Sequence, residues 1–585
     1  MPTCRRALCS LQCWSWPIGA ITGSSCLLTR LCRPGRFTTT EISTNIGAYL
    51  PSARWSPLKR VAPFIIAFSA AGLTMGPAAA MTLNVATFAE AITVFPKAFE
   101  GWDVVAIGDC LEGLVTEDAA GRAIPGQAQS WTVSDDGLTY TFRLRPDAMW
   151  SDHTPVVAQD FVTAFRWLFD PSNAVEYASL QFQIRNAAAL AQGTIADMSQ
   201  LGVSAPDEHT LVLQLDSPTP YFLEALTHYS AYPVPTARFE RLGEAWLTPE
   251  NVVCNGPFTI QEKQPGGVIH SLRSTTYYDR ANVAADEVYY HSFTDLSRGL
   301  EMFEKGDIDL VIALPREANA WVQAHVPDES RVEPFLGVYY FVLNQDKPPF
   351  DKPEIRRALS MAIDRDRIDP FGLDTPELSA YGWVPEGTAG YPALPPFEPD
   401  WAGWPMDQRR VWATAALAKY GYTSAHPLTV QLRYSTVSDD SHQRIAMAVA
   451  AMWDAIGVRT ELVSASVEDH FNALRTGNFD VGRASWLLDI SDPSDVLDIM
   501  SKHSDYNFGG YSNPDYEALL ASAANERNLS KRADLLRSAE ELAVADTAAI
   551  PIYWFSIQNL VSRSLEGVVH NPKNVHRSRW ISKKD

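Results

Sequence analysis

Residues that could do chemistry are plentiful in this sequence, but none of the familiar catalytic or metal-binding spacings is present. The chain has no H-E-x-x-H, G-x-S-x-G, G-x-x-x-x-G-K-[ST], G-x-G-x-x-G or C-x-x-C motif. His470 follows Glu468 and Asp469, a pattern more typical of a solvated helix face than of a metal ligand. Asp489 and Asp492 are an acid pair without a motif, so an enzyme remains an alternative. The sequence predicts no cofactor and no metal, and it gives no positive sign of catalysis.

Length and charge define the class of protein. A chain of 585 residues exceeds the size of one hydrophobic core, so we expect two or three domains. Hydrophobic residues make up 46% and charged residues 20%, as in soluble globular proteins. Eight basic residues and one acid precede residue 81, so the remainder carries a formal charge of −28, against −21 overall. Such an acidic body would repel phosphate backbones, which argues against nucleic acid as a partner.

Residues 58–80 have the organisation of a secretory signal peptide. Lys59 and Arg60 precede an apolar stretch, residues 61–75, and the segment ends in the small-residue pattern Ala78-Ala79-Ala80. The apolar stretch is shorter than the roughly 20 residues of a membrane-spanning helix. We therefore expect cleavage after Ala80 and a periplasmic protein. Met81 rather than Cys follows the cleavage site, which argues against a lipid anchor.

The cysteines divide into two sets. Five of the seven lie within residues 1–57, a segment without helix or strand periodicity, and we interpret this segment as a mis-annotated extension with translation starting near Leu58. Cys110 and Cys254 remain in the mature chain. Export permits a disulfide between them, and two buried free thiols are the alternative.

Local patterns in the mature chain are mixed. Residues 139–144 and 210–215 alternate between apolar and polar side chains, as half-buried strands do. Residues 159–169, 354–363 and 443–456 have apolar residues three and four apart, which predicts amphipathic helices. No repeat or low-complexity linker separates domains. The fold class is α/β or α+β with interleaved domains.

A series of short phrases along residues 81–585 carries a family resemblance. They are Glu112-Gly113-Leu114, Trp150-Ser151-Asp152-His153-Thr154-Pro155, Asp160-Phe161, Asp170-Pro171, Asn255-Gly256-Pro257-Phe258, Gly306-Asp307-Ile308-Asp309, Phe350-Asp351, Ile355-Arg356-Arg357-Ala358-Leu359, Ala362-Ile363-Asp364-Arg365, Phe479-Asp480-Val481, Trp486 and Pro551-Ile552-Tyr553-Trp554. In this order and at these intervals they resemble the periplasmic oligopeptide-binding proteins, cluster C (family 5) of the solute-binding proteins of ABC transporters.

The resemblance implies a two-lobed α/β periplasmic binding protein fold of type II, with an extra subdomain and a hinge. Lobe I would comprise residues 81–124, 243–336 and 556–585, with 125–242 as its extra subdomain. Lobe II would comprise residues 337–555. The Trp150 phrase and the helix of residues 356–365 are interpreted as scaffold.

The resemblance also implies a ligand held by strand addition, in which main-chain hydrogen bonds give affinity whatever the side chains of the ligand are. The segments that would pair with a peptide are Glu112-Gly113-Leu114 and Ser485-Trp486-Leu487. A peptide ammonium buried in this way needs a carboxylate. Asp489 is predicted to supply it, and its alternative role is a helix N-cap, for which Asp492 or Ser491 is better placed.

The ligand carboxylate is predicted to meet Arg483 and His442, with Arg475 near a third family position. Residues 368–384 contain no Lys or Arg, where the family pattern has a lysine, and include Asp369, Asp374 and Glu377. We therefore expect C-terminally blocked or basic peptides to bind at least as well as free acidic ones. Val342 replaces an acid of some relatives.

The remaining ligand candidates complete the predicted site. Aromatic side chains in matched segments could form sequence-tolerant walls, although core packing is the commoner fate of each. These aromatic residues are Phe335, Tyr339, Tyr340, Trp486, Tyr553 and Trp554, and the polar candidates are Asn255, Gly256 and Asn507.

The function implied is that of a monomeric extracytoplasmic solute-binding protein of an ABC importer. It would bind oligopeptides or peptide-like solutes in a closed interlobe cleft and deliver them to permease subunits in the inner membrane, without chemical change. The alternatives are a periplasmic peptide hydrolase and a chaperone or sensor on the same fold.

Overall fold

The computed structural model describes residues 80–87, 104–173, 175–248, 250–263, 267–293, 295–368, 378–391, 395–436 and 440–584. The predictions for residues 1–57, for the signal peptide up to residue 79 and for the acidic loop 369–377 lie outside these residues. No helix in the described part of the chain has both the length and the apolar composition needed to span a bilayer.

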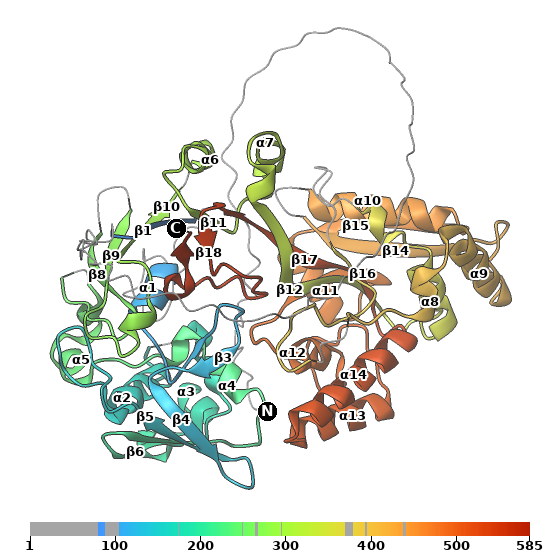
Figure 1. Ribbon diagram of the computed structural model, residues 1–585. Coiled ribbons are helices and arrows are strands. Elements are labelled where there is room, and N and C mark those ends of the chain that lie inside the picture. The colour runs from blue at the N-terminus through green and yellow to red at the C-terminus, as the bar shows by residue number, and fades with distance from the viewer. Residues whose placement is uncertain are drawn as a thin grey trace, which may run out of the picture. The chain divides into compact units, whose positions relative to one another are not determined.

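The largest element is an 11-stranded sheet that runs through the molecule (Figure 1). Its strand order is β15-β14-β16-β12-β17-β11-β1-β10-β9-β8, and β13 pairs with β17 off this path. The strands are β1 (Thr82–Thr87), β8 (Phe258–Lys263), β9 (Ile269–Arg273), β10 (Glu287–Ser292), β11 (Leu310–Ile312), β12 (Ser330–Leu343), β13 (Leu378–Ser379), β14 (Leu428–Ser435), β15 (Val458–Ala465), β16 (Val481–Leu487) and β17 (Ile550–Val561).

The two long strands β12 and β17 connect different hydrophobic cores. Successive side chains of a strand point to opposite faces, so Val338 and Tyr340 of β12 enter one core while Tyr339 and Phe341 enter another. Both of these cores consist of residues between 336 and 554. A third, larger core is built from the chain before residue 313 together with residues near the C-terminus. The lobe boundaries given above stay a prediction.

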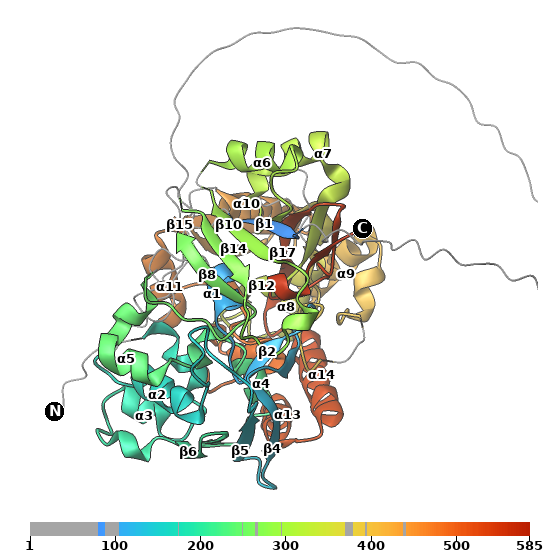
Figure 2. The ribbon, with the colours of Figure 1, turned by 60° about the vertical axis from the view of Figure 1, so that its left-hand side comes forward.

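A smaller four-stranded sheet has the order β4-β5-β7-β6, with β4 (Ala128–Val133), β5 (Thr139–Leu144), β6 (Val203–Asp207) and β7 (Thr210–Gln214). The two predicted strands are confirmed as β5 and β7. Helix α2 (Ala158–Leu168) packs on β6 and β7 (Figure 2). Its buried Asp160 accepts hydrogen bonds from the Trp150 indole at 3.0 Å and the Val157 amide at 3.1 Å. The first of these bonds joins the Trp150 phrase to the Asp160-Phe161 phrase, which gives both a structural role.

The predicted helices are confirmed within two residues at each end, as α2, α8 (Pro353–Met361) and α10 (Ser441–Asp454). The other helices are α1 (Val104–Cys110), α3 (Ala187–Ala191), α4 (Phe222–Ala225), α5 (Thr236–Leu242), α6 (Leu296–Glu304), α7 (Asn319–His325), α9 (Met406–Lys419), α11 (Val467–Arg475), α12 (Pro493–Leu497), α13 (Pro514–Asn525) and α14 (Leu529–Ala545). Helices α13 and α14 lie side by side (Figure 1). Two short hairpins pair β2 (Val115–Glu117) with β3 (Ala123–Pro125), and β18 (Leu565–Glu566) with β19 (Ser582–Lys583).

Cys110 and Cys254 form a disulfide that bridges 144 residues of sequence. Of the two alternatives open from sequence, the structure has the disulfide. It joins the end of α1 to the Asn255-Gly256 segment. The Gly256 amide also donates to the Cys110 carbonyl at 2.9 Å. The disulfide and this hydrogen bond therefore hold the segment that leads to Glu112 against the Asn255-Gly256 segment.

Candidate ligand-binding site

One group of predicted ligand residues, here called the β16 group, lies on strand β16, just after it or, for His442 of α10, against Arg483. Its members are Arg483, Ser485, Trp486, Leu487, Asp489 and His442. β16 pairs antiparallel with β12, with Arg483 opposite Phe341 and Ser485 opposite Tyr339. Because side chains alternate along a strand, Arg483 and Ser485 share one face and Trp486 points to the other. Arg483 and Ser485 can therefore contact the same ligand group, whereas Trp486 faces the opposite side of the sheet.

Only part of the other edge of β16 is paired with a strand. β14 pairs with β16 only at Leu432↔Val481 and Arg433↔Gly482. Beyond Gly482, no strand of the described chain pairs with this edge. An uncovered strand edge can accept an extended peptide as an added strand.

Arg483 is a buried cation whose partners are neutral. Its side chain donates to His442 Nε2 at 2.9 Å and to Ser485 Oγ at 3.2 Å, and the residue is only 5% exposed. Burial, reinforced by the nearby Arg483 charge, lowers the pKa of His442 to about 3, so this imidazole is uncharged at neutral pH. Among the described residues, no carboxylate lies within ion-pair distance of Arg483. A buried charge without a counter-ion is costly, and a ligand carboxylate would relieve that cost.

Arg483, the neighbouring Tyr339, and Ser435, whose carbonyl contacts His442, each have a polar atom left unused by the described residues. Within the described chain, Tyr339 Oη, Ser435 Oγ and Arg483 Nε are buried and have no hydrogen-bond partner. The Tyr339 ring lies 5.7 Å from the His442 ring, and the Arg483 guanidinium lies 5.8 Å from the Tyr339 centroid. Buried polar groups are normally satisfied, so a concentration of unsatisfied ones is typical of a site that holds water or ligand.

Asp489 is an unpaired acid beside this strand. Its side chain is exposed, and no described residue donates a hydrogen bond to it or forms an ion pair with it. Desolvation by the surrounding protein nevertheless raises the pKa of its carboxyl group. The N-cap of α12 is Asp492, whose side chain accepts from the Ser494 amide, so the capping alternative for Asp489 is excluded.

The second group of predicted residues, here called the Glu112 group, consists of Glu112, Gly113, Leu114, Asn255 and Gly256. Asn255 brackets the Glu112 backbone, because its Oδ1 accepts from the Glu112 amide at 3.0 Å and its Nδ2 donates to the Glu112 carbonyl at 2.9 Å. A Cβ on Gly256 would lie 2.6 Å from the Asp109 carbonyl oxygen, so only glycine fits there. These contacts make the group a tightly packed piece of backbone.

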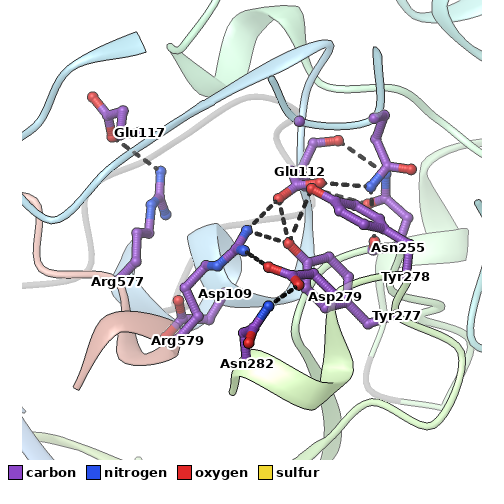
Figure 3. Close-up of polar contacts among 12 residues, drawn as sticks. Asp109, Glu112, Glu117, Asn255, Tyr277, Tyr278, Asp279, Asn282, Arg577 and Arg579 are labelled. Atoms are coloured by element: carbon purple, nitrogen blue, oxygen red, sulfur yellow. Dashed lines mark hydrogen bonds and ion pairs between the residues drawn. The ribbon is translucent and has the colours of Figure 1, made fainter. Parts of the chain in front are cut away.

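The Glu112 carboxylate points into a buried polar network (Figure 3). Arg579 lies 3.1 Å from its Oε1, Tyr277 donates to the same oxygen at 2.7 Å, and Gln127 donates to Oε2 at 2.8 Å. Arg579 also pairs with Asp279 at 2.5 Å. Burial raises the pKa of Glu112, and Arg579 acts in the opposite direction. The side chain of Glu112 is thus fully engaged within the protein.

The backbone of Gly113 and Leu114 is only partly available for a ligand. The Gly113 carbonyl accepts from the Gln127 amide at 2.9 Å, and the Leu114 carbonyl accepts from Gly126 at 3.1 Å and Ala128 at 3.0 Å. In the described chain the amides of Gly113 and Leu114 have no such partner. Main-chain pairing with a ligand here therefore depends on these two donors.

The structure places the other predicted residues in different surroundings. Tyr553 stacks on Tyr339 with ring centroids 4.9 Å apart, which puts it on the Arg483 side of β12. Tyr340 packs against Trp383 on the opposite side, and Trp554 is buried in that same core. The Asn507 side chain exchanges two hydrogen bonds with the Tyr511 backbone, so it closes its own loop.

Three further residues bear on the predicted sites and were not identified from the sequence. Asp495 accepts from the Trp486 indole, and Arg579 holds Glu112. His470 was predicted to lie on a solvated helix face, and this prediction is wrong: it is fully buried, and its Nε2 lies 2.9 Å from the Arg483 carbonyl oxygen. The apolar spacing of Phe471 and Leu474 beside it was the signal that α11 buries this face.

A hollow of about 650 Å³ lies between α2 and α5 and includes Trp167 and Phe239 in its lining. None of the predicted ligand residues lines it.

Comparison with known proteins gives a consistent result. Residues 122–508 match the family model of the bacterial extracellular solute-binding proteins, family 5. The chain is 34% identical to the periplasmic oligopeptide-binding protein OppA of Escherichia coli over 496 residues, 84% of this chain and 90% of that protein. It is also 34% identical to the periplasmic murein peptide-binding protein MppA of E. coli over 486 residues, 82% and 88% of the two chains.

A solved structure of the murein tripeptide-binding protein MppA in an unliganded open form superposes with a TM-score of 0.79 at 31% identity, covering 86% of this chain and 98% of that one. The predicted two-lobed α/β fold of the periplasmic binding proteins is therefore confirmed. From the matched residues, the identity and the shared fold, we conclude that the chain belongs to the bacterial extracellular solute-binding proteins of family 5.

Proposed function

We propose that this protein is the extracytoplasmic solute-binding protein of an ABC importer, and that it binds oligopeptides or peptide-like solutes and delivers them unchanged to a membrane permease. We further propose that it acts as a monomer in the periplasm after cleavage following Ala80. Family membership and the names of the relatives, which bind oligopeptides and murein peptides, support this proposal.

One observation carries the proposal: the β16 group has a buried cation and an acid, both unpaired by the described residues, on the same short stretch of chain. Arg483 and Asp489 flank the uncovered edge of β16. An extended zwitterion laid along this edge would bring its carboxylate to Arg483 and its ammonium to Asp489. Backbone hydrogen bonds between them would be indifferent to ligand side chains.

Charge complementarity supports one direction of the ligand over the other. Placed the other way round, the ligand ammonium would meet Arg483 and its carboxylate would meet Asp489, and both contacts would be repulsive. Because His442 is neutral, it adds a hydrogen-bonding group for a carboxylate without adding charge. The second strand of the ligand site is assigned to the Glu112 group, through the free amides of Gly113 and Leu114.

Asp489→Asn tests the ammonium contact. The substitution keeps the shape but leaves the ligand ammonium unpaired once ligand covers it, at a cost of about 3 to 5 kcal/mol, which is roughly a hundredfold to several thousandfold in Kd. Calorimetry with a free peptide and with its N-acetylated form should show that the two changes are not additive, because both remove the same interaction.

Asp498→Asn is the matched control, since Asp498 is another exposed acid nearby and should leave affinity close to wild type. Wild-type affinity in Asp489→Asn would show that Asp489 does not hold the ligand. Mass spectrometry of a peptide mixture after incubation tests the hydrolase alternative, for which new peptide termini would be required.

A further inference from the structure

We infer that Asp495 is the positioning residue for Asp489, and that ligand binding is coupled through it to the release of a proton. The inference rests on the proposed role of Asp489 as the acceptor of the ligand ammonium. It concerns a residue outside the predicted ligand set.

Asp495 holds both ends of the segment that contains Asp489. Its Oδ1 accepts from the Trp486 indole at 2.5 Å, and its Oδ2 accepts from the Ile490 amide at 3.0 Å. Asp489 lies between these two anchor points. The Leu488 amide also donates to the Leu336 carbonyl at 2.9 Å, which fixes the segment against β12.

The support of Asp495 is rigid. It lies in the first turn of α12, whose N-cap Asp492 accepts two hydrogen bonds of 2.7 Å from Arg532 of α14. Both side chains of this ion pair are nearly fully buried. Through its two hydrogen bonds, Asp495 can therefore hold Trp486 and Ile490 at a fixed position relative to α12.

Only the ionised carboxylate accepts strongly at both oxygens, because protonation turns one of them into a donor and a weaker acceptor. The charges that face Asp495 oppose this ionised form: Asp489 and Asp492 are both acids, and the Arg532 charge is already engaged by Asp492. Tyr221, which also faces it, is neutral, because burial raises its pKa. Burial is the largest cause that raises the pKa of Asp495, to about 7.

A ligand ammonium at Asp489 would cancel the stronger of the two opposing charge effects on Asp495. Asp495 would then lose its proton, complete both hydrogen bonds and tighten the segment around the ligand. With a pKa near 7, binding at pH 6.5 should release roughly 0.5 to 0.8 protons per ligand. Affinity should rise roughly tenfold to twentyfold between pH 5.5 and 7.5, a range in which the ligand α-amino group remains largely charged.

The experiment is calorimetry of trialanine binding at pH 6.5 in two buffers of different ionisation enthalpy, together with the Kd at pH 5.5 and 7.5. We expect Asp495→Asn to release little or no proton, to have less than a threefold pH dependence and to bind roughly tenfold more weakly at pH 7.5. Asp498→Asn, which removes a neighbouring acid without a bond to Trp486 or Ile490, should behave as wild type.

A second measurement needs no ligand. The indole ¹⁵N–¹H resonance of Trp486, assigned by its loss in Trp486→Phe, should titrate with a midpoint near pH 7 in the free wild-type protein and not in Asp495→Asn. An unchanged proton release in Asp495→Asn, or an indole resonance that does not move between pH 5.5 and 8, would overturn the inference. If the resonance titrates but wild type does not bind trialanine, the proposed function is wrong and the coupling with it, while the contact between Asp495 and Trp486 stands.

Discussion

The Glu112 group and the β16 group both contain charged residues. Those of the Glu112 group are paired within the protein, whereas Arg483 and Asp489 of the β16 group have no charged partner among the described residues. Glu112 is bound by Arg579, Tyr277 and Gln127 inside the protein (Figure 3). Arg483 has a neutral imidazole and a hydroxyl as partners, and Asp489 has no partner among the described residues.

The contrast favours a structural role for the charges of the Glu112 group and a ligand-binding role for those of the β16 group. The C-terminal segment supplies cations to the Glu112 region, since Lys573 pairs with Glu117 at 2.9 Å and Arg577 lies near Asp109 and Glu117. Breaking such pairs should cost stability. We expect the unpaired charges of the β16 group to contribute little to stability and, under the proposed function, to determine affinity. The following predictions test this division, from the largest expected effect to the smallest.

Arg579→Met should destabilise the protein by about 3 to 5 kcal/mol, because it leaves the buried Glu112 carboxylate without its counter-ion. The loss should be smaller at pH 5 than at pH 7, since Glu112 can then take up a proton. Urea unfolding at the two pH values measures both effects. The double variant Arg579→Met/Glu112→Gln should recover part of the loss, and full additivity would contradict the pairing.

Arg483→Met should give the opposite result. Stability should change by less than about 1 kcal/mol, because no ion pair is broken, while affinity for a free-acid peptide should fall by about 1.5 to 3 kcal/mol, roughly tenfold to a hundredfold. The same peptide with an amidated C-terminus should lose much less. If the amidated and free peptides lose affinity equally, Arg483 does not meet the ligand carboxylate.

Asp498→Asn tests how one acid near the β16 group changes the pH dependence of stability. Although the Asp498 side chain is exposed, desolvation by the surrounding protein raises its pKa to about 6, from the 3.8 of an unhindered carboxyl. The folded state therefore holds this proton more tightly, so stability from this group is present below pH 4 and is lost as pH rises through 6. Asp498→Asn should stabilise at pH 8 by about 1 kcal/mol or less, since the side chain is exposed and screened. The difference should vanish at pH 4 in thermal unfolding.

Arg563→Ala should change stability by less than about 0.5 kcal/mol. Arg563 pairs with Asp328 at 2.5 Å, but the two side chains are 68% and 74% exposed. Comparing it with Arg579→Met in the same urea titration isolates the contribution of burial. An effect as large as that of Arg579→Met would contradict the interpretation that burial makes the pairs of the Glu112 region important.

Much of the fold could be predicted from periodicity. The strands at 139–144 and 210–215 and the helices α2, α8 and α10 were predicted from local apolar patterns, because each element buries one face. His470 was not, since the acids before it suggested an exposed face. Its burial follows from how α11 packs, which depends on β14 and β15 and not on local sequence.

The residues of the candidate site also divide into those that could be predicted from the sequence and those found only in the structure. Asp489 and Arg483 could be predicted from the sequence because they flank Trp486, which belongs to the matched series. Asp495 and Arg579 act through partners that pack against them, and for Arg579 the partner Glu112 is 467 residues away in sequence. Sequence spacing cannot reveal a contact of that range, and it did not indicate the hydrogen bonds of Asp495 to Trp486 and Ile490, so both sets of contacts became visible only in the structure.

By itself, the sequence determined the family and the fold class, because these follow from residue types and their order, and it predicted the segments that would meet a peptide. It left open whether Cys110 and Cys254 are joined, and it could not show which charges are already paired. Tertiary packing decided both. Whether a buried carboxylate stabilises the protein or waits for a ligand depends on the groups within a few ångströms of it, and chain segments far apart in sequence supply those groups.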